Sequence, residues 1–380
     1  MAGIWDAVKR YLKRGDTFLL VLCVLASVFG IVLISSAVKP FDDPAHYVKV
    51  QTIALILGII MFIFFSTIDL ELLCDRWKLL LIINILAISS LFVFGVEGDS
   101  GNKSWISYSW MPFSIQPAEV VKLTFTLLMA RQMSAYRERI NAPSSIVKLL
   151  GHLLLMMGLI LLSSRDAGMA IVYAIIFVFM AFSAGVSLPW FFAWLAAAAV
   201  ALPLLWQSGV INDYQKDRIM IIFDPSIDPE NLTIGWHAAQ SKLALGGGRI
   251  VGQGLGNGNI TQSGSMFASH TDFIFSTAGE ELGLVGCIAI LAILTGIVAC
   301  CFYRAVRCRN PMNAYICAGF AGMMAFQIFE NVGMCLGIMP VIGLTLPFFS
   351  YGGSSLVTTF CCMGIISGIR LKPPPIVPRY

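Results

Sequence analysis

Ten long apolar runs dominate this sequence and limit what it can fold into. A helix needs roughly 20 mostly apolar residues to cross the hydrocarbon core of a bilayer. Only 12% of the residues are charged, against about 25% in soluble domains, which excludes a water-soluble globule and a nucleic-acid-binding protein. The sequence therefore predicts an all-α, multi-pass membrane protein, a single domain over residues 1–380. Its ten transmembrane helices are expected near residues 17–38, 49–68, 77–96, 116–134, 146–164, 167–185, 188–208, 273–303, 313–337 and 347–369.

The distribution of lysine and arginine predicts how these helices are oriented. With the N-terminus inside, sixteen of the 25 cationic side chains fall in cytoplasmic segments and eight in outward segments, while Lys122 lies within a span. Cytoplasmic loops of membrane proteins carry such an excess of positive charge. We therefore expect both termini in the cytoplasm and a large extracytoplasmic loop over residues 209–272, between helices seven and eight.

That loop is rich in glycine, from Gly246 to Gly258. A dinucleotide-binding loop would have to follow a strand and open a helix within a βαβ unit, and this segment lacks that setting. Close backbone approach and tight turns explain the glycines better. The ten cysteines form no C-x-x-C or Cys/His metal spacing, so the sequence predicts no zinc site and no protein-bound metal.

Ionisable side chains within the predicted spans are candidates for a functional site, because such groups are costly in lipid. Glu119 and Lys122 follow Pro117, which suits a helix start, and their spacing places them on one helix face. They either neutralise each other inside the bundle or offer Lys122 to an anionic lipid headgroup. Glu280 and Glu281 lie about two turns into the eighth span, where two carboxyls must be protonated, paired or turned toward a cavity.

A third polar group ends the long loop immediately before the eighth span, at His270, Thr271 and Asp272. Aspartate commonly caps the helix that follows it. A carboxylate at a membrane surface can also act as a general base. Position alone leaves both interpretations open.

Motifs from the fourth to the tenth span follow one another over about 250 residues. They are Phe113-Ser114-Ile115-Gln116-Pro117-Ala118-Glu119 with Lys122, Tyr214-Gln215 with Arg218, Ala239-Gln240-Ser241, His270-Thr271-Asp272-Phe273, Glu280-Glu281-Leu282-Gly283, and Leu346-Pro347-Phe348 with Ser350-Tyr351-Gly352-Gly353. As an ordered set they resemble the SEDS family, the RodA/FtsW/SpoVE group of bacterial cell-wall polymerases.

The resemblance implies a peptidoglycan glycosyltransferase that polymerises lipid II at the outer face of the bacterial cytoplasmic membrane. It implies that Asp272 is the catalytic residue. It also suggests that Arg218, Lys122 and Lys103 face the substrate phosphates, that Gln116, Gln240 and Ser241 bind substrate, and that Glu119, Glu281, His270 and Thr271 support the site. A class B penicillin-binding protein is the implied partner. The resemblance fixes no cofactor, and a divalent cation, Mg²⁺ or Mn²⁺, would suit a diphosphate leaving group.

The sequence departs from the family at several positions. Alanine replaces serine at Ala118, and Lys103 stands where arginine is usual. The segment Arg165–Ala170 lacks the usual proline and threonine, so no role is assigned to Asp166. The motifs do not separate an elongation enzyme from a division or sporulation enzyme.

Two other classes of function compete with the polymerase. In a lipid II flippase or other transporter, the charges within the spans would line a path. In a non-catalytic scaffold, the chain would only recruit a partner enzyme.

Overall fold

A computed structural model describes residues 16–96, 102–108, 111, 113–207, 213–229, 235–266 and 268–371 of the chain. Within these ranges the secondary structure is helical, and the only β pairing is a pair of isolated bridges, Val96 to Trp105 and Ile106 to Ile115. The all-α prediction is therefore confirmed.

A helix covers each of the ten predicted apolar runs. These helices are α2 (Thr17–Ala37), α3 (Pro44–Thr67), α5 (Trp77–Ser89) with α6 (Leu91–Phe94), α7 (Pro117–Ala135), α8 (Pro143–Ser164), α9 (Ala167–Ser183), α10 (Leu188–Gln207), α14 (Ile274–Arg307), α15 (Pro311–Cys335) and α16 (Gly353–Leu371). Six are long and apolar enough to cross a membrane: α2, α3, α5 with α6, α8, α14 and α15. The chain is thus a multi-pass membrane protein, and the number ten stays a prediction.

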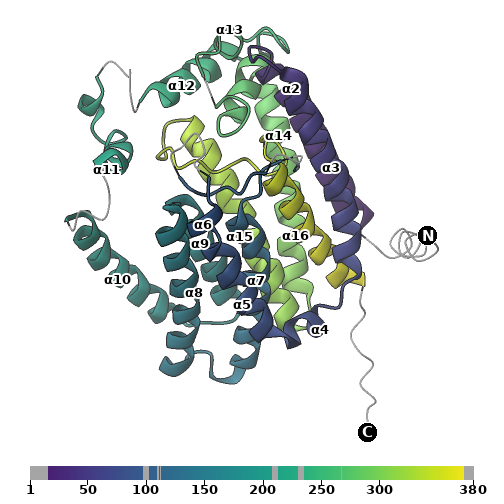
Figure 1. The fold of residues 1–380 in the computed structure, drawn as a ribbon, viewed down its shortest axis with the longest axis vertical. Coiled ribbons are helices and arrows are strands. Elements are labelled where there is room, and N and C mark those ends of the chain that lie inside the picture. The colour runs from purple at the N-terminus through teal and green to yellow at the C-terminus, as the bar shows by residue number, and fades with distance from the viewer. Residues whose placement is uncertain are drawn as a thin grey trace.

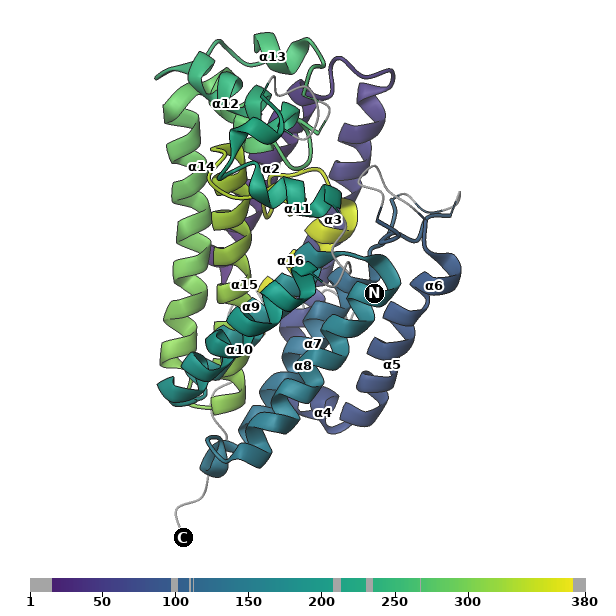
Figure 2. The same ribbon diagram turned by 90° about the vertical axis from the view of Figure 1, so that its left-hand side faces the viewer.

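The helices form an elongated bundle, in which α16 packs mainly on α3, and α15 packs on α14 and α9 (Figure 1). Shorter helices lie at the ends of the bundle. Figure 2 shows α12 (Trp236–Gly248) and α13 (Asn259–Gln262) at one end, with α11 (Asp213–Met220) nearby. The short helix α4 (Leu70–Asp75) lies at the opposite end, and 3-10 turns occur at Arg137–Arg139 and Pro225–Ile227.

A buried ion pair ties three helices together at the start of α2. Asp16 caps α2 by accepting a hydrogen bond from the Leu19 backbone N–H at 3.1 Å. The same carboxylate pairs with Arg304 of α14, and the Asp16 backbone N–H donates to Ser367 Oγ of α16 at 3.3 Å. A charge left alone in this place would be strongly destabilising.

Helix α14 is broken at Gly283, which has φ 67° and ψ −164°. The segment 249–254 fills the break. Leu284 and Val285 donate their backbone N–H groups to carbonyls of this segment, and two of its N–H groups donate to the carbonyls just before Gly283, all at 2.9–3.1 Å. The break therefore costs few hydrogen bonds, because the loop supplies the missing partners.

Two glycines of the long loop make this close approach feasible. A Cβ atom added to Gly248 would overlap the backbone at Gly279, and one added to Gly252 would overlap the backbone at Glu281. Gly252 also has φ +81°, a conformation that disfavours other residues. The sequence-based explanation of the glycines by close backbone approach is confirmed at these positions.

Candidate active site

Asp272 lies in the tight turn that joins the long loop to α14. Both Thr271 and Phe273 donate their backbone N–H groups to the carbonyl of Ala268, at 3.2 and 3.1 Å. The N-cap residue of α14 is Phe273, and no side-chain hydrogen bond caps the helix. Of the two interpretations of Asp272, the structure does not support the helix cap, because the turn places Asp272 one residue before the N-cap position. Its half-buried carboxylate thus remains available for other chemistry.

Helix α15 holds the backbone of Asp272 in place. Asn331 Nδ2 donates to the carbonyl oxygen of Asp272 and to that of Leu344, both at 2.8 Å. Cys335, one turn further along α15, directs its Sγ to the same Asp272 oxygen at 3.8 Å. The carbonyl of Asp272 is therefore fixed from a rigid element, as a catalytic position requires.

The two residues before Asp272 rest on the segment that leads into α16. Ser350 Oγ donates to the carbonyl of Thr271 at 2.6 Å, and the Tyr351 N–H donates to the carbonyl of His270 at 2.8 Å. The His270 ring lies among Phe41, Tyr47 and Tyr351, with ring centroids 5.0–5.5 Å away. This packing is consistent with the supporting roles predicted for His270 and Thr271.

Burial raises the pKa of Asp272 to about 6. The guanidinium of Arg218 opposes this rise because it favours the carboxylate, whereas the carboxyl of Asp166 adds to it. Arg218 lies on α11, and its Nη1 donates to the Val341 carbonyl at 3.4 Å. The Asp272 carboxylate faces Gly343, where an added Cβ would lie 3.5 Å from Oδ2. A carboxylate with a pKa near the working pH suits general base catalysis.

Asp166 is part of this site, although its sequence context assigned it no role. It caps α9 by accepting the Met169 N–H at 2.9 Å. Its carboxylate also accepts hydrogen bonds from Gln116 Nε2 at 3.0 Å and from Ser104 Oγ at 3.3 Å. Burial raises the pKa of Asp166 despite these hydrogen bonds. The structure thus directs the Gln116 side chain to Asp166.

A family model for cell cycle proteins, FtsW/RodA/SpoVE, matches residues 16–372. The chain belongs to the FtsW/RodA/SpoVE family. The probable peptidoglycan glycosyltransferase FtsW of Geobacter metallireducens is 32% identical over 377 residues, covering 96% of this chain and 98% of that protein. The peptidoglycan glycosyltransferase MrdB of Escherichia coli K12 is 31% identical over 370 residues, covering 96% and 95%.

Solved structures extend this SEDS relationship to the fold. A chain from a study of polymerization and crosslinking by a peptidoglycan synthase complex is 28% identical and superposes with a TM-score of 0.77, covering 94% of this chain and 97% of that chain. The rod shape determining protein RodA of Thermus thermophilus is 26% identical with a TM-score of 0.68, covering 94% and 96%. The RodA-like fold of this chain is therefore shown.

Glu119 and Lys122 of this SEDS protein form a buried ion pair in α7, with Nζ 2.6 Å from Oε2. The pairing expected from their spacing is confirmed, as is the helix start at Pro117. Lys122 is 0% exposed, so its ammonium would have to be uncovered before it could touch a lipid headgroup. The structure presents Lys122 as the partner of Glu119, and its contact with a headgroup stays a prediction.

The remaining predicted substrate residues differ in accessibility. Ser241 is completely buried, and its Oγ bonds Ser276 Oγ at 2.5 Å and the Cys335 carbonyl at 2.8 Å. The structure therefore gives it a packing role between α12, α14 and α15, in place of the predicted substrate contact. Gln240 is half-buried on α12 and Lys103 is exposed, so both stay predictions.

Glu280 and Glu281 hold the long loop against α14. Glu280 accepts the backbone N–H groups of Ile260 and Thr261 at 2.7 and 2.9 Å, which caps α13. Glu281 Oε1 accepts Ser36 Oγ at 2.7 Å and Gln262 Nε2 at 3.0 Å. The sequence predicts that these carboxyls are protonated, paired or turned toward a cavity, and the structure shows them paired with hydrogen-bond donors. The supporting role predicted for Glu281 is consistent with these contacts.

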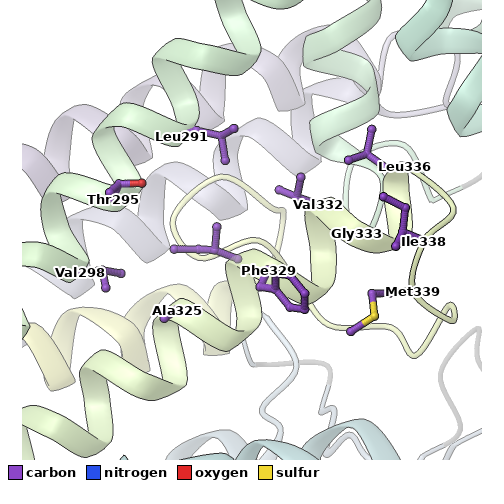
Figure 3. Close-up of a pocket in the computed structure, with 11 residues that line it drawn as sticks. Leu291, Thr295, Val298, Ala325, Phe329, Val332, Gly333, Leu336, Ile338 and Met339 are labelled. Carbon is purple, nitrogen blue, oxygen red and sulfur yellow. The ribbon is translucent and has the colours of Figure 1, made fainter.

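A groove lies between α14 and α15 (Figure 3). Its volume is about 440 Å³, and its lining is apolar apart from Thr295. The side chains drawn in Figure 3 point into the groove from both helices and from the turn that contains Ile338 and Met339. Its lining contains no ionisable side chain that could act as a general base for glycosyl transfer.

The described residues contain no group of three or more His, Cys, Asp or Glu side chains that could hold a metal ion. The divalent cation therefore stays a prediction, with no such cluster to hold it in this part of the chain.

Glu330 is the ionisable residue near Asp272 that sequence reasoning missed. It lies on α15 directly before Asn331, and its carboxyl interacts electrostatically with that of Asp272. A carboxyl inside the ninth predicted span was a usable signal, because such groups are costly in lipid.

Proposed function

We propose that this chain polymerises lipid II into glycan strands at the outer face of the bacterial cytoplasmic membrane. One observation carries the proposal: the backbone of Asp272 is held by α15 just before α14, and its half-buried carboxyl has a pKa raised to about 6 within electrostatic range of Arg218. Curated relatives named peptidoglycan glycosyltransferase align with this chain over nearly their full length.

The reaction is a single displacement. The 4-hydroxyl of the acceptor sugar attacks the anomeric carbon of the donor disaccharide, and Asp272 takes the hydroxyl proton. The new glycosidic bond forms as the bond from the anomeric carbon to the pyrophosphate oxygen breaks. The electron pair leaves with the lipid pyrophosphate, and the anomeric configuration inverts. By analogy with inverting glycosidases, one base on the acceptor side is sufficient.

Arg218 is the cation placed to bind the donor pyrophosphate. Its guanidinium lies within electrostatic range of Asp272 and approaches the Val341 carbonyl. Arginine can bind phosphate oxygens in a bidentate manner, which favours it over lysine. With Lys122 buried, Arg218 and the exposed Lys103 are the candidates among the described residues.

The topology proposed for this reaction has ten spans, with residues 209–272 outside and both termini inside. In this topology the end of the bundle that carries α12 and α13 would face outward, and Asp272, just before the eighth span, would lie at the outer boundary of the membrane. The basic residues before Asp16 and after Leu371, on which the orientation partly depends, lie outside the described residues.

The partner that we propose is a class B penicillin-binding protein, which would crosslink the new strands. The structural relative from a peptidoglycan synthase complex supports this proposal. Relatives named FtsW and MrdB have nearly equal identity, so elongation and division are equally open roles.

Fluorescent lipid II incubated with purified protein tests the function. We expect wild-type protein to form glycan chains on gels and Asp272→Ala to form none. Asp75→Ala, a substitution of an exposed aspartate at the opposite end of the bundle, serves as the matched control. Lipid scrambling without chains would instead identify a flippase. Full complementation of a deletion strain by Asp272→Asn would identify a scaffold, since scaffolding needs no proton transfer.

A further inference from the structure

Helix α15 contains a buried carboxyl that the proposed reaction does not use. Glu330 is 1% exposed. Its carboxyl approaches the backbone of Ile342, but neither oxygen has a hydrogen-bond partner of good geometry among the described residues. An ionised carboxylate without partners in such a place is very costly, whereas a protonated one is tolerated.

The position of Glu330 relative to Asp272 is set by the backbone. Its neighbour Asn331 bonds the carbonyls of both Asp272 and Leu344 at 2.8 Å. The segment 341–344 thus lies between the two carboxyls, with Ile342 close to Glu330 and Gly343 close to Asp272 Oδ2. Two carboxyls held on either side of one short segment cannot both ionise without mutual repulsion.

The other charged groups near α15 do not compensate a second carboxylate. On α7 the charges of Glu119 and Lys122 cancel, and on α14 both glutamates are occupied by the long loop. Asp166, at the start of α9, adds negative charge. Lys242 of α12 lies against Gly337, about two turns beyond Glu330. The cations at the far ends of these helices are Arg131 of α7, and Arg304, which pairs with Asp16, and Arg307 of α14. The remaining titratable side chains on α15 and the helices packed against it include Tyr173, His237, Cys287, Cys300, Cys301, Tyr303, Tyr315, Cys317, Cys335, Cys361 and Cys362.

We propose that the working site holds one proton on the Asp272–Glu330 pair, carried by Glu330, and that loss of this proton at alkaline pH blocks donor binding. This inference rests on the proposed function. Asp272 ionises first because it is partly exposed and faces Arg218. Ionised Glu330 would then add a second negative charge where one arginine must attract a pyrophosphate. Glu330 is accordingly a positioning residue, which acts through the charge of the site.

The pH dependence of kcat/KM for chain synthesis tests this proposal. Wild-type protein should show an alkaline limb that falls about tenfold per pH unit, as expected for one ionisation. Glu330→Gln should abolish this limb and leave the acid limb within about 0.3 unit, because a neutral amide replaces a neutral acid. Glu330→Asp keeps a carboxyl and should retain the limb. Glu138→Gln, at an exposed position in the turn Arg137–Arg139, should behave as wild type.

Two results would overturn the proposal: a wild-type profile without an alkaline limb, or an alkaline limb that survives in Glu330→Gln. An acid limb moved down by a full unit in Glu330→Gln would do the same, since it would mean that Glu330 is ionised in the working range.

A second measurement does not depend on catalysis. The infrared difference spectrum of wild type minus Glu330→Gln at neutral pH should contain the carbonyl stretch of a protonated carboxylic acid. A carboxylate band in its place would refute the proton assignment even in protein that makes chains. A protonated acid in protein that makes no chains would uphold the assignment while the proposed function fails.

Discussion

The charges around Asp272 should move the acid limb of the pH–rate profile in opposite directions when they are removed one at a time. Below its pKa of about 6 Asp272 is protonated and cannot accept the hydroxyl proton, so activity falls as the pH falls through this value. Arg218 favours the carboxylate, and therefore Arg218→Ala should raise the midpoint of the limb. Asp166 favours the protonated form, and therefore Asp166→Asn should lower it.

The expected size of the first shift follows from the loss of one charge near a partly exposed carboxyl. A change of about 1 kcal/mol in charge–charge interaction corresponds to about 0.7 pKa unit. At pH 6 the ionised fraction of Asp272 would then fall from about one-half to about one-sixth, a threefold loss of base. At pH 8 the same variant would keep nearly all of its base, so the defect caused by proton affinity should disappear there.

Initial rates of chain formation from fluorescent lipid II between pH 5 and 8 would measure the midpoint. Loss of the phosphate contact in Arg218→Ala lowers the rate at every pH and weakens the apparent affinity, but it does not move the midpoint. Arg139→Ala, which removes an exposed arginine in the turn between α7 and α8, controls for a general loss of positive charge. A midpoint that stays at the wild-type value in both site variants, or that moves in the same direction in both, would refute the electrostatic reasoning.

Two further predictions concern stability. Glu119→Ala and Lys122→Ala should each lower the free energy of unfolding by about 3–5 kcal/mol, because each leaves a buried charge unpaired. The double variant should lose clearly less than the sum of the two single losses. Unfolding of all four proteins in detergent measures this double-mutant cycle, and strict additivity would contradict the coupling. Gly252→Ala should cost about 2–4 kcal/mol, because the added Cβ meets the backbone at Glu281 and φ is positive. Gly246→Ala, where a Cβ meets open space inside α12, should be neutral or slightly stabilising in the same thermal unfolding assay, and equal losses in the two variants would refute the close approach.

The sequence was sufficient for features set by local pattern. Each apolar run became a helix because length and hydrophobicity alone favour a helix in a membrane. Pro117 marked the start of α7, and the spacing of Glu119 and Lys122 placed them side by side. These features depend on residues within a few positions of one another, so no knowledge of the tertiary fold was needed.

The site required contacts that no local pattern encodes. Asp272, Asp166 and Glu330 lie on three separate parts of the chain, and only the packing of α9 and α15 around the segment 341–344 brings their charges together. The same limit applies to Ser241, for which the sequence motif predicts a substrate contact. Its motif placed it in the outward loop, but the turn of α12 against α14 buried it.

The break in α14 connects the fold to the chemistry. In an unbroken helix, Glu280 and Glu281 would lie in lipid or in a dry interface without donors. Because Gly283 interrupts the helix, the segment 249–254 reaches the break and α13 presents its N–H groups to Glu280. The same interruption leaves residues 274–282 as a short helical segment. This segment packs against the long loop and against α15. Asp272 precedes the N-cap residue Phe273 of this segment, so its position depends on the loop glycines Gly248 and Gly252, which approach the backbone at Gly279 and Glu281.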